Sequence, residues 1–212
     1  MDIEGFIFTG GRSSRMGSRK DLITLGGTSL VERAAVALAP VCTNKVRIIG
    51  LPPPSDVKFA NIPDEPWLVN GVEIEGPLRG LRTACRAAST SWIAILACDL
   101  PFVTPEVFRA LHERLTSCVT TANEPDAIVP TQPDERPQPL CSLYRRKPVL
   151  AAVRNLTDSK DRSLRTLLSC VTTQYIPYSA FSDLPYAEHL FLNINSPADY
   201  DRAKGILQNS GF

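Results

Sequence analysis

The sequence has almost no excess of charge of either sign. Its 212 residues carry 23 lysines and arginines against 22 aspartates and glutamates, which gives a formal net charge of +1. A chain without a strong overall charge is not drawn to nucleic acid or to anionic lipid by its global field. No apolar run approaches the roughly 20 residues that a membrane-spanning helix needs. We therefore expect neither a nucleic-acid-binding protein nor a membrane protein, and any anion must be bound locally.

Metal-binding and redox patterns of cysteine are also absent. The six cysteines contain no C-x-x-C pair, the spacing of zinc ribbons and thioredoxin-like sites, and we expect reduced, buried thiols. There are two histidines, His112 and His189, and no Ser-His-Asp pattern indicates a nucleophilic hydrolase. The chain opens Met-Asp-Ile-Glu, which lacks the basic flank of a signal peptide. We therefore expect a cytoplasmic protein.

The overall amino-acid composition is typical of one folded domain. With 43% hydrophobic and 21% charged residues, a chain of this length buries roughly 70% of its unfolded surface and needs no disulfide or metal for stability. No internal repeat, low-complexity tract or linker divides it. We expect a single domain over residues 1–212, and the composition excludes a disordered tail or a collagen-like fibre.

Hydrophobic periodicity predicts alternating strands and helices. The first apolar run, Ile3–Phe8, is followed by a glycine-rich stretch and by a helix that the capping box Ser29-x-x-Glu32 opens. The run from Trp92 to Cys98 does not alternate, which is typical of a central strand buried on both faces. Further strands or apolar segments are expected at 46–49, 57–62, 127–129, 140–144 and 173–176, and further helices at 78–88, 105–115, 148–154, 162–168 and from 197. The alternation predicts an α/β fold with a mostly parallel central sheet and helices on both faces.

The segment from Thr9 to Lys20 directly follows the first predicted strand. In open α/β sheets, ligands bind at the carboxyl ends of the strands. Glycines allow main-chain N–H groups to approach a ligand, and cationic side chains add positive charge. The segment contains Gly10, Gly11, Gly17, Arg12, Arg15, Arg19 and Lys20. It predicts a polyphosphate-binding loop rather than a solvated basic turn, although neither the Walker spacing nor the dinucleotide fingerprint G-x-G-x-x-G is present.

Acidic residues follow two other predicted strands. Asp99 comes directly after the buried run, at the edge of the sheet that carries the glycine loop. A carboxylate at this place suits Mg²⁺, which prefers oxygen ligands and shares them with substrate phosphates. The alternative interpretation is that Asp99 caps the turn that follows, as aspartate often does. Asp64 should reach the same edge, as a second acid near the metal, as a partner of a ribose hydroxyl, or as an acid that begins a loop.

The segment Gly76-Pro77-Leu78 is a rigid turn that leads into a predicted helix. A helix N-terminus favours anions, and small residues there could border a nucleotide base. The alternative interpretation is ordinary helix punctuation.

Taken in order, these motifs resemble the molybdenum cofactor guanylyltransferases and the wider MobA-like nucleotidyltransferases. The resemblance spans nearly the whole chain. The matching segments are Phe8-Thr9-Gly10-Gly11, Ser14-Arg15-Met16-Gly17 with Lys20, Gly76-Pro77-Leu78, Cys98-Asp99-Leu100-Pro101, Pro139-Leu140-Cys141-Ser142-Leu143-Tyr144 and Asn193-Ile194-Asn195-Ser196-Pro197. The resemblance implies a Rossmann-like nucleotidyltransferase fold. It also implies an enzyme that joins the GMP moiety of GTP to molybdopterin or the molybdenum cofactor and releases pyrophosphate.

The resemblance assigns nucleotide binding to the N-terminal half. The residues concerned are Thr9, Gly10, Gly11, Lys20, Asp64, Gly76, Pro77, Leu78 and Asp99. We expect three residues to be catalytic. Arg15 and Lys20 would neutralise the charge of the leaving pyrophosphate, and Asp99 would bind Mg²⁺ as well as the nucleotide. No protein nucleophile or general base is required, because a phosphate acceptor is already ionised at pH 7.

The C-terminal half is expected to bind the acceptor. Asn193 and Asn195 would close the site from the pterin side, or serve as turn and cap residues before Pro197. Arg162 and Ser163 lie where the family handles its second substrate. The implied partners are these substrates, with transient contacts to cofactor-biosynthesis proteins and to the apo-enzymes that accept the product.

Two positions depart from the family pattern. Thr9 stands where members commonly carry alanine. Gly50-Leu51 stands where guanylyl-transferring members tend to carry an asparagine after the second strand. Related branches use CTP with the same cofactor, or transfer nucleotides to other acceptors such as sugar phosphates, and the fold alone does not choose between them. A nucleotide-binding regulatory protein is a further alternative, against which the presence of Lys20 and Asp99 argues.

Overall fold

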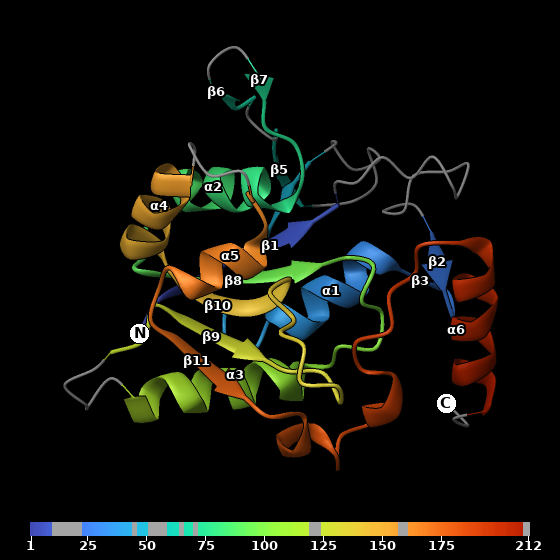
Figure 1. Ribbon diagram of the computed structural model, residues 1–212. Coiled ribbons are helices and arrows are strands. Elements are labelled where there is room, and N and C mark those ends of the chain that lie inside the picture. Colours follow the sequence, from blue (N-terminus) through green and yellow to red (C-terminus); the bar gives the residue numbers. More distant parts are fainter. Residues whose placement is uncertain are drawn as a thin grey trace.

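The computed structural model describes residues 1–9, 23–43, 46–50, 59–63, 66–69, 72–118, 124–156 and 161–209. Within these ranges the main sheet has seven strands, in the order β11-β9-β10-β8-β1-β4-β5 (Figure 1). The strands are β1 (Ile3–Phe8), β4 (Arg47–Ile49), β5 (Ala60–Ile62), β8 (Trp92–Ala97), β9 (Ala127–Pro130), β10 (Cys141–Arg145) and β11 (Thr173–Ile176).

One strand of this sheet runs against the others. β10 pairs antiparallel with both β8 and β9, whereas the remaining pairs are parallel. The mostly parallel sheet predicted from the sequence is therefore confirmed. After β1 the chain passes to β4 and β5 on one side, and later to β8 on the other. The topological switch point, where open α/β sheets bind ligands, lies between β1 and β8.

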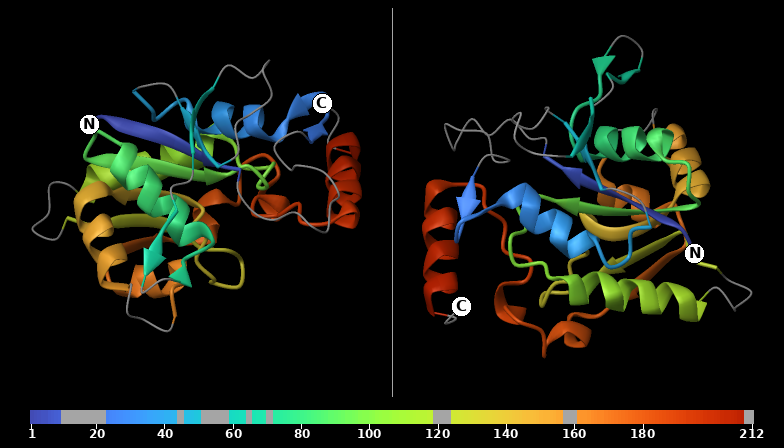
Figure 2. Two further views of the ribbon diagram at one scale, coloured as in Figure 1. Left: turned by 90° about the horizontal axis from the view of Figure 1, so that it is seen from above. Right: turned by 180° about the vertical axis from the view of Figure 1, so that it is seen from behind.

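Helices cover both faces of the sheet, as predicted (Figures 1 and 2). One face carries α1 (Leu30–Leu38) and α3 (Pro105–Cys118), and the other carries α2 (Pro77–Ala87), α4 (Arg146–Asn155) and α5 (Leu164–Ser169). The last helix, α6 (Pro197–Asn209), stands beside a small hairpin, and the Tyr200 hydroxyl donates to the Thr24 carbonyl at 2.9 Å. No helix in the described ranges is long and apolar enough to cross a membrane.

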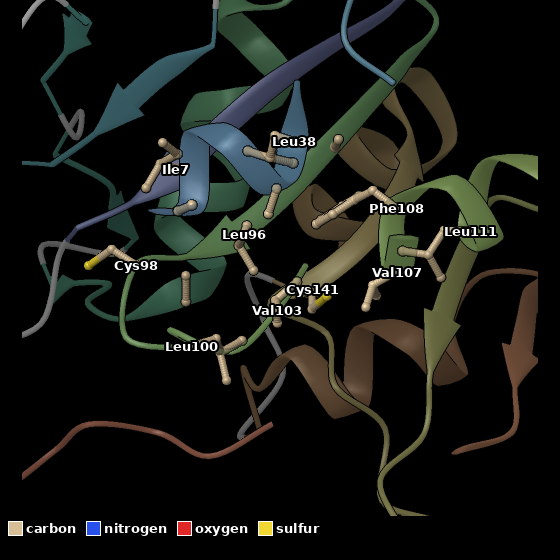
Figure 3. Packing of buried hydrophobic residues seen from close by; sticks show 14 of the residues in the cluster. Ile7, Leu38, Leu96, Cys98, Leu100, Val103, Val107, Phe108, Leu111 and Cys141 are labelled. Carbon is tan, nitrogen blue, oxygen red and sulfur yellow. The ribbon is translucent and has the colours of Figure 1, made fainter. Parts of the chain in front are cut away.

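Each central strand contributes to two cores because successive side chains point to opposite faces. In β1, Ile3 and Ile7 join the core under α1 and α3, whereas Phe6 and Phe8 join the core under α2, α4 and α5. Figure 3 shows the first of these cores, where Ile7 and Leu96 of neighbouring strands lie with side chains of α1 and α3. Burial on both faces explains why the β1 and β8 sequences are apolar throughout.

The predicted element boundaries agree with the structure where local signals are strong. The capping box at α1 is formed in both directions: the Glu32 N–H donates to Ser29 Oγ at 3.2 Å, and the Ser29 N–H donates to the Glu32 carboxylate at 2.9 Å. Of the strand predicted at 57–62, residues 60–62 form β5, and 57–58 lie outside the described residues.

Several short elements were not predicted from the sequence. They are the hairpin of β2 (Thr24–Leu25) and β3 (Thr28–Ser29), the hairpin of β6 (Leu68–Val69) and β7 (Val72–Glu73), and the 3₁₀ helices η3 (Tyr178–Phe181) and η4 (Ala187–His189).

A buried carboxylate fastens the amino edge of the sheet. Glu4 is 5% exposed and accepts hydrogen bonds from the Ser89 N–H and hydroxyl, both at 2.7 Å, and from the Thr90 N–H at 3.0 Å. Arg47 pairs with its other oxygen and stacks over the Phe6 ring. Burial raises the pKa of Glu4, but the hydrogen bonds from Ser89 and Thr90 and the charge of Arg47 outweigh it and leave that pKa below its ordinary value.

All six cysteines are free thiols, as predicted, but they are not all buried. Cys85, Cys98 and Cys141 are buried, whereas Cys170 is exposed on the turn after α5. The expectation of uniform burial is therefore wrong. A thiol on a turn has no packed layer above it, because turns run over the surface.

Candidate functional site

The candidate site is centred on the carboxyl ends of β1 and β8. Beyond the last paired residues, the Cys98 N–H still donates to the Phe8 carbonyl at 3.0 Å. On the other side, the N–H and hydroxyl of Thr9 both donate to the Ile49 carbonyl, at 3.1 and 3.2 Å. Main-chain bonds therefore fix the chain at the points where it leaves β1 and β8. The hydroxyl that distinguishes Thr9 from the more usual alanine is used to join β1 to β4.

Asp99 lies in the turn that follows β8 and is half-buried. The Leu100 N–H donates to the Ala97 carbonyl at 3.3 Å, which closes the turn. The carbonyl of Asp99 accepts a hydrogen bond of 2.9 Å from the Ile194 N–H. This bond brings the late segment from Asn193 to Asn195 alongside Asp99, although the two are far apart in the sequence.

The late segment is held in place from both ends. Ile194 is fully buried in the core, and its neighbours Asn193 and Asn195 have exposed side chains. The carboxylate of Asp199 accepts from the Asn195 N–H at 3.0 Å and from the Ser196 N–H at 2.8 Å. The main chain here is therefore a helix cap, as one interpretation of the sequence expected. The bond from Ile194 to Asp99 places the main chain of both asparagines, whose side chains are exposed, near the edge that carries Asp99.

The first turn of α2 reaches the same edge of the sheet. Gly76 precedes the helix with φ of 92°, a conformation that favours glycine, and Pro77 is the first helical residue. Both are exposed, whereas the Leu78 side chain is buried in the core, so its main chain is the part that a ligand can reach. A Cβ atom at Gly80 would lie 3.0 Å from the Phe8 ring. The amino end of α2 therefore packs directly against the end of β1.

A feature that sequence reasoning missed borders this helix end. Glu73 of the β6–β7 hairpin forms an ion pair with Arg79 of α2 at 2.6 Å. Trp67, at the base of the hairpin, is buried and lies 5.3 Å from the Arg82 guanidinium, which stacks over its ring. Strands of two residues leave no periodic signal, so the hairpin could not be predicted from pattern.

Arg162 and Ser163 lie at the start of α5, on the face of the sheet that carries α2 and α4. The Ser163 hydroxyl accepts from the Thr166 N–H at 3.1 Å and caps the helix. The Ser163 N–H in turn donates to the Asp161 carboxylate at 3.0 Å. In the structure Ser163 therefore caps α5. The predicted role of Arg162 in binding the acceptor stays a prediction.

Five of the predicted site residues lie outside the described residues: Gly10, Gly11, Arg15, Lys20 and Asp64. These five residues belong to the stretches 10–22 and 64–65. Thr9 and Pro63, the described residues that precede the two stretches, directly follow β1 and β5. Both segments therefore start from the carboxyl edge of the sheet. Gly50, which directly follows β4, has φ of 128°, which a residue with a Cβ adopts only under strain. An asparagine in place of Gly50 would therefore require a different path for the main chain.

The metal prediction concerns Asp99. In the described part of the chain, no group of three or more His, Cys, Asp or Glu side chains is placed to hold a metal ion. Mg²⁺ is usually held by one or two carboxylates together with substrate phosphates. A half-buried carboxylate at the switch point fits that kind of donor set.

Comparison with known proteins gives a consistent result. Residues 5–175 match the family model described as the MobA-like NTP transferase domain. Two similar curated proteins are both named probable molybdenum cofactor guanylyltransferase. The protein of Bacillus cereus is 30% identical over 97% of each chain, and that of Carboxydothermus hydrogenoformans is 28% identical over 92% of each. A solved structure, the molybdopterin-guanine dinucleotide biosynthesis protein A of Archaeoglobus fulgidus, is 22% identical with a TM-score of 0.74, over 97% of this chain and 99% of its own.

Proposed function

Because this chain belongs to the MobA-like NTP transferase family of nucleotidyltransferases, we propose that it transfers GMP from GTP to molybdopterin or the molybdenum cofactor. The reaction is Mg²⁺-dependent and releases pyrophosphate. The observation that carries the proposal is the hydrogen bond from Ile194 to Asp99. It joins the nucleotide side of the site, at β1 and β8, to the acceptor side at Asn193 and Asn195.

The proposed division of labour follows the two halves of the chain. The N-terminal half holds GTP through the loop after Thr9, through Asp64 and through the amino end of α2. The C-terminal half holds the acceptor, with Asn193 and Asn195 facing the switch point. The position of α2 supports the first part, because the positive end of a helix dipole favours the phosphate groups of a nucleotide.

The proposed reaction is an in-line displacement at phosphorus. An oxygen of the acceptor phosphate forms a bond to the α-phosphorus of GTP, while the bond from the α-phosphorus to the bridging oxygen breaks and pyrophosphate leaves. Arg15, Lys20 and the amides of the glycine loop stabilise the charge that develops on pyrophosphate. The acceptor phosphate is ionised at neutral pH, so no residue needs to remove a proton from it.

Asp99 is the residue proposed to hold Mg²⁺. When bound, the ion would neutralise phosphate charge and lower the barrier to displacement. The contribution of the chain is to keep the Asp99 carboxylate in place. The turn bond to Ala97 and the bond from Ile194 both act on the main chain of this segment.

A second candidate differs in the nucleotide. The chain has Gly50, with φ of 128°, where guanylyl-transferring relatives tend to carry asparagine. This difference favours testing CTP as donor, either to the same cofactor or to another phosphate acceptor such as a sugar phosphate. A base pocket that hydrogen-bonds its base rejects the wrong one strongly, because unmatched buried donors and acceptors are left unpaired.

The test is a nucleotide panel with a pterin acceptor. Purified protein is incubated with Mg²⁺, molybdopterin or its molybdenum form, and GTP, CTP or ATP, and pyrophosphate release is measured with and without the acceptor. The proposal expects release with GTP that depends on the acceptor, and much slower release with CTP and ATP. Preference for CTP would support the second candidate. Failure of every nucleotide with a pterin acceptor would refute both pterin-dependent assignments.

Within this proposal the enzyme works in the cytoplasm, where GTP is available. Its contacts with proteins that deliver the cofactor, and with apo-enzymes that receive the product, are transient.

A further inference from the structure

A cavity of about 170 Å³ lies beside η4, at the carboxyl edge of the sheet. Gln132 follows β9, and Tyr178 follows β11; both line it. Because β10 is antiparallel to both β8 and β9, and β11 is parallel to β9, the strands β8, β9 and β11 all run in one direction. The cavity therefore opens on the same edge as Asp99, on the side of the C-terminal half.

The cavity is connected to Asp99 through the main chain. Its wall includes the segment from Leu190 to Leu192, which leads directly into Asn193. Two residues of extended chain span at most about 7 Å, so Leu192 lies within that distance of Ile194, the residue bonded to Asp99. One wall of the cavity therefore leads, within two residues, to the main chain that is bonded to Asp99.

The wall on the η4 side is well fixed. The Tyr178 hydroxyl donates to the Ala187 carbonyl at 2.7 Å, which ties η3 to η4. The Phe102 ring, three residues after Asp99, is fully buried and packs 6.2 Å from the His189 ring and 5.1 Å from the Tyr186 ring. Tyr186, the residue that precedes η4, has φ of 61°, a conformation that few residues other than glycine adopt. The turn after β8 and the cavity wall thus share one packed aromatic group.

Polar and apolar groups both line the cavity. Gln132, Glu188, His189 and Arg202 bring donors and acceptors, and Pro133, Phe191 and Leu192 bring apolar surface. The Nδ1 atom of His189 is buried and has no hydrogen-bond partner within the described ranges. A buried polar atom without a partner costs stability that a bound ligand can restore.

The volume indicates the size of the ligand. About 170 Å³ is several times the volume of one water molecule, about 30 Å³. It is below the roughly 300 Å³ from which sites that enclose a whole drug-sized ligand begin. The cavity therefore suits a ring system rather than an entire nucleotide.

We propose that this cavity binds the heterocyclic ring of the acceptor, with the acceptor phosphate extending along Leu192 and Asn193 to Asp99. A pterin-type ring is flat and carries an amino group beside a carbonyl on one edge. Glu188 can accept from the N–H groups of that edge, Arg202 can donate to its carbonyl, and Phe191 and Leu192 can contact its faces. The inference rests on the proposed function and adds the acceptor subsite to it.

A neighbouring cavity of about 330 Å³ shares Ala187, Glu188 and His189 with the smaller one and is otherwise lined by Tyr186 and by Ile206 and Asn209 of α6. Among the described residues, its lining includes none that follows a strand of the sheet, whereas Gln132 and Tyr178 line the smaller cavity, so we assign the ring to the smaller one.

The first experiment fills the cavity. Ala187 is half-buried and lines both cavities, so Ala187→Phe should block the ring, and Arg202, which lines only the smaller cavity, is needed to tell the two apart. With a 6-substituted pterin phosphomonoester as acceptor, we expect the acceptor KM to rise by about tenfold or more, with kcat within about threefold and GTP affinity unchanged. Ala151→Phe, on the exposed side of α4, is the matched control and should leave all three values at those of the wild type.

A second pair of variants keeps the test independent of folding around Ala187. Arg202 is exposed on α6 and lines the cavity, whereas Lys204, exposed on the same helix, does not line it. Arg202→Gln should raise the acceptor KM by about tenfold, since a charge-assisted hydrogen bond is lost. Lys204→Gln should not change it.

The outcomes separate the two proposals. A wild-type enzyme without acceptor-dependent pyrophosphate release refutes the proposed function, and the subsite with it. An active wild type with unchanged acceptor KM in Arg202→Gln overturns the subsite alone, whether or not Ala187→Phe raises that KM, because Ala187 also lines the neighbouring cavity. An equal loss of GTP affinity in either variant also overturns it, because the cavity would then not be specific to the acceptor.

Discussion

A methyl group added at Gly5 should destabilise the protein, and removal of the Cys42 thiol should reverse most of that loss. Gly5 is in the middle of β1, on the face covered by α1. A Cβ atom built at Gly5 would lie 2.6 Å from Cys42 Sγ and 3.1 Å from a methyl group of Val46. Favourable contacts between such atoms begin near 3.5 Å, so the sulfur atom would have to move by about 1 Å. Overpacking of this kind costs about 1–3 kcal/mol.

The double variant provides the sharper test. Cys42→Ala alone removes one largely buried heavy atom and should cost about 1 kcal/mol. In Gly5→Ala/Cys42→Ala, the new methyl group occupies the space that the sulfur leaves. We therefore expect the double variant to be more stable than the sum of the single changes by about 1–2 kcal/mol, with the Val46 contact accounting for the part that is not recovered.

Urea unfolding followed by far-UV circular dichroism measures this coupling, and equal m-values in the four proteins would show that the unfolding transition is the same. Gly205→Ala is the control, because, apart from the adjoining residues and backbone of α6 itself, no heavy atom of the described residues lies within 4 Å of its Cβ position. It should stabilise the protein by about 0.5–1 kcal/mol through helix propensity. Additivity of the two single changes to within about 0.5 kcal/mol would refute the argument from close packing.

Three further predictions concern charge. Asp99→Asn should lower the rate of transfer by about a hundredfold or more with little change in the melting temperature; near-normal turnover at ordinary Mg²⁺ would contradict the metal assignment. Lys20→Ala should weaken GTP binding, measured by calorimetry, by more than Arg19→Ala does, and equal small effects would mean that the loop is only a basic turn. The pKa of Glu4 is lowered in the folded protein, so its contribution is complete above its ordinary value of 4.5 and is lost as pH falls through the folded value. Glu4→Gln should therefore cost about 1–3 kcal/mol of unfolding free energy at pH 7, and this cost should shrink progressively as the pH falls below 4.5; a cost independent of pH would argue against this.

The sequence predicted the central strands and the helices that cover them because their signals are local. Apart from Glu4, which is paired, and Gly5, every residue of the runs Ile3–Phe8 and Trp92–Ala97 is apolar, so both faces of each strand are apolar. The Ser29 capping box places the start of α1 to the residue. Such features depend on a few neighbouring residues, so their pattern survives without knowledge of the fold.

The arrangement of the later elements depends on distant contacts that no local pattern records. β10 lies between β8 and β9, although β9 precedes it in the sequence, and its apolar side chains are compatible with either direction. The same holds for the site. The late asparagines could be connected with Asp99 only through the family resemblance, because the bond from Ile194 is made by the main chain. The cavity beside η4 is built from turns, which have no period to detect.

The bond between Ile194 and Asp99 also means that the candidate site forms late during synthesis at the ribosome. Chains are made from the amino terminus, and early parts begin to fold first. β1, β4, β5 and β8 pair with one another, so they can associate before the last third of the chain has emerged. The carbonyl of Asp99 receives its hydrogen bond from Ile194 only when synthesis is almost finished. A nascent chain interrupted before Ile194 has both neighbouring strand ends but lacks the segment that faces them, so the site is completed only with the last helix.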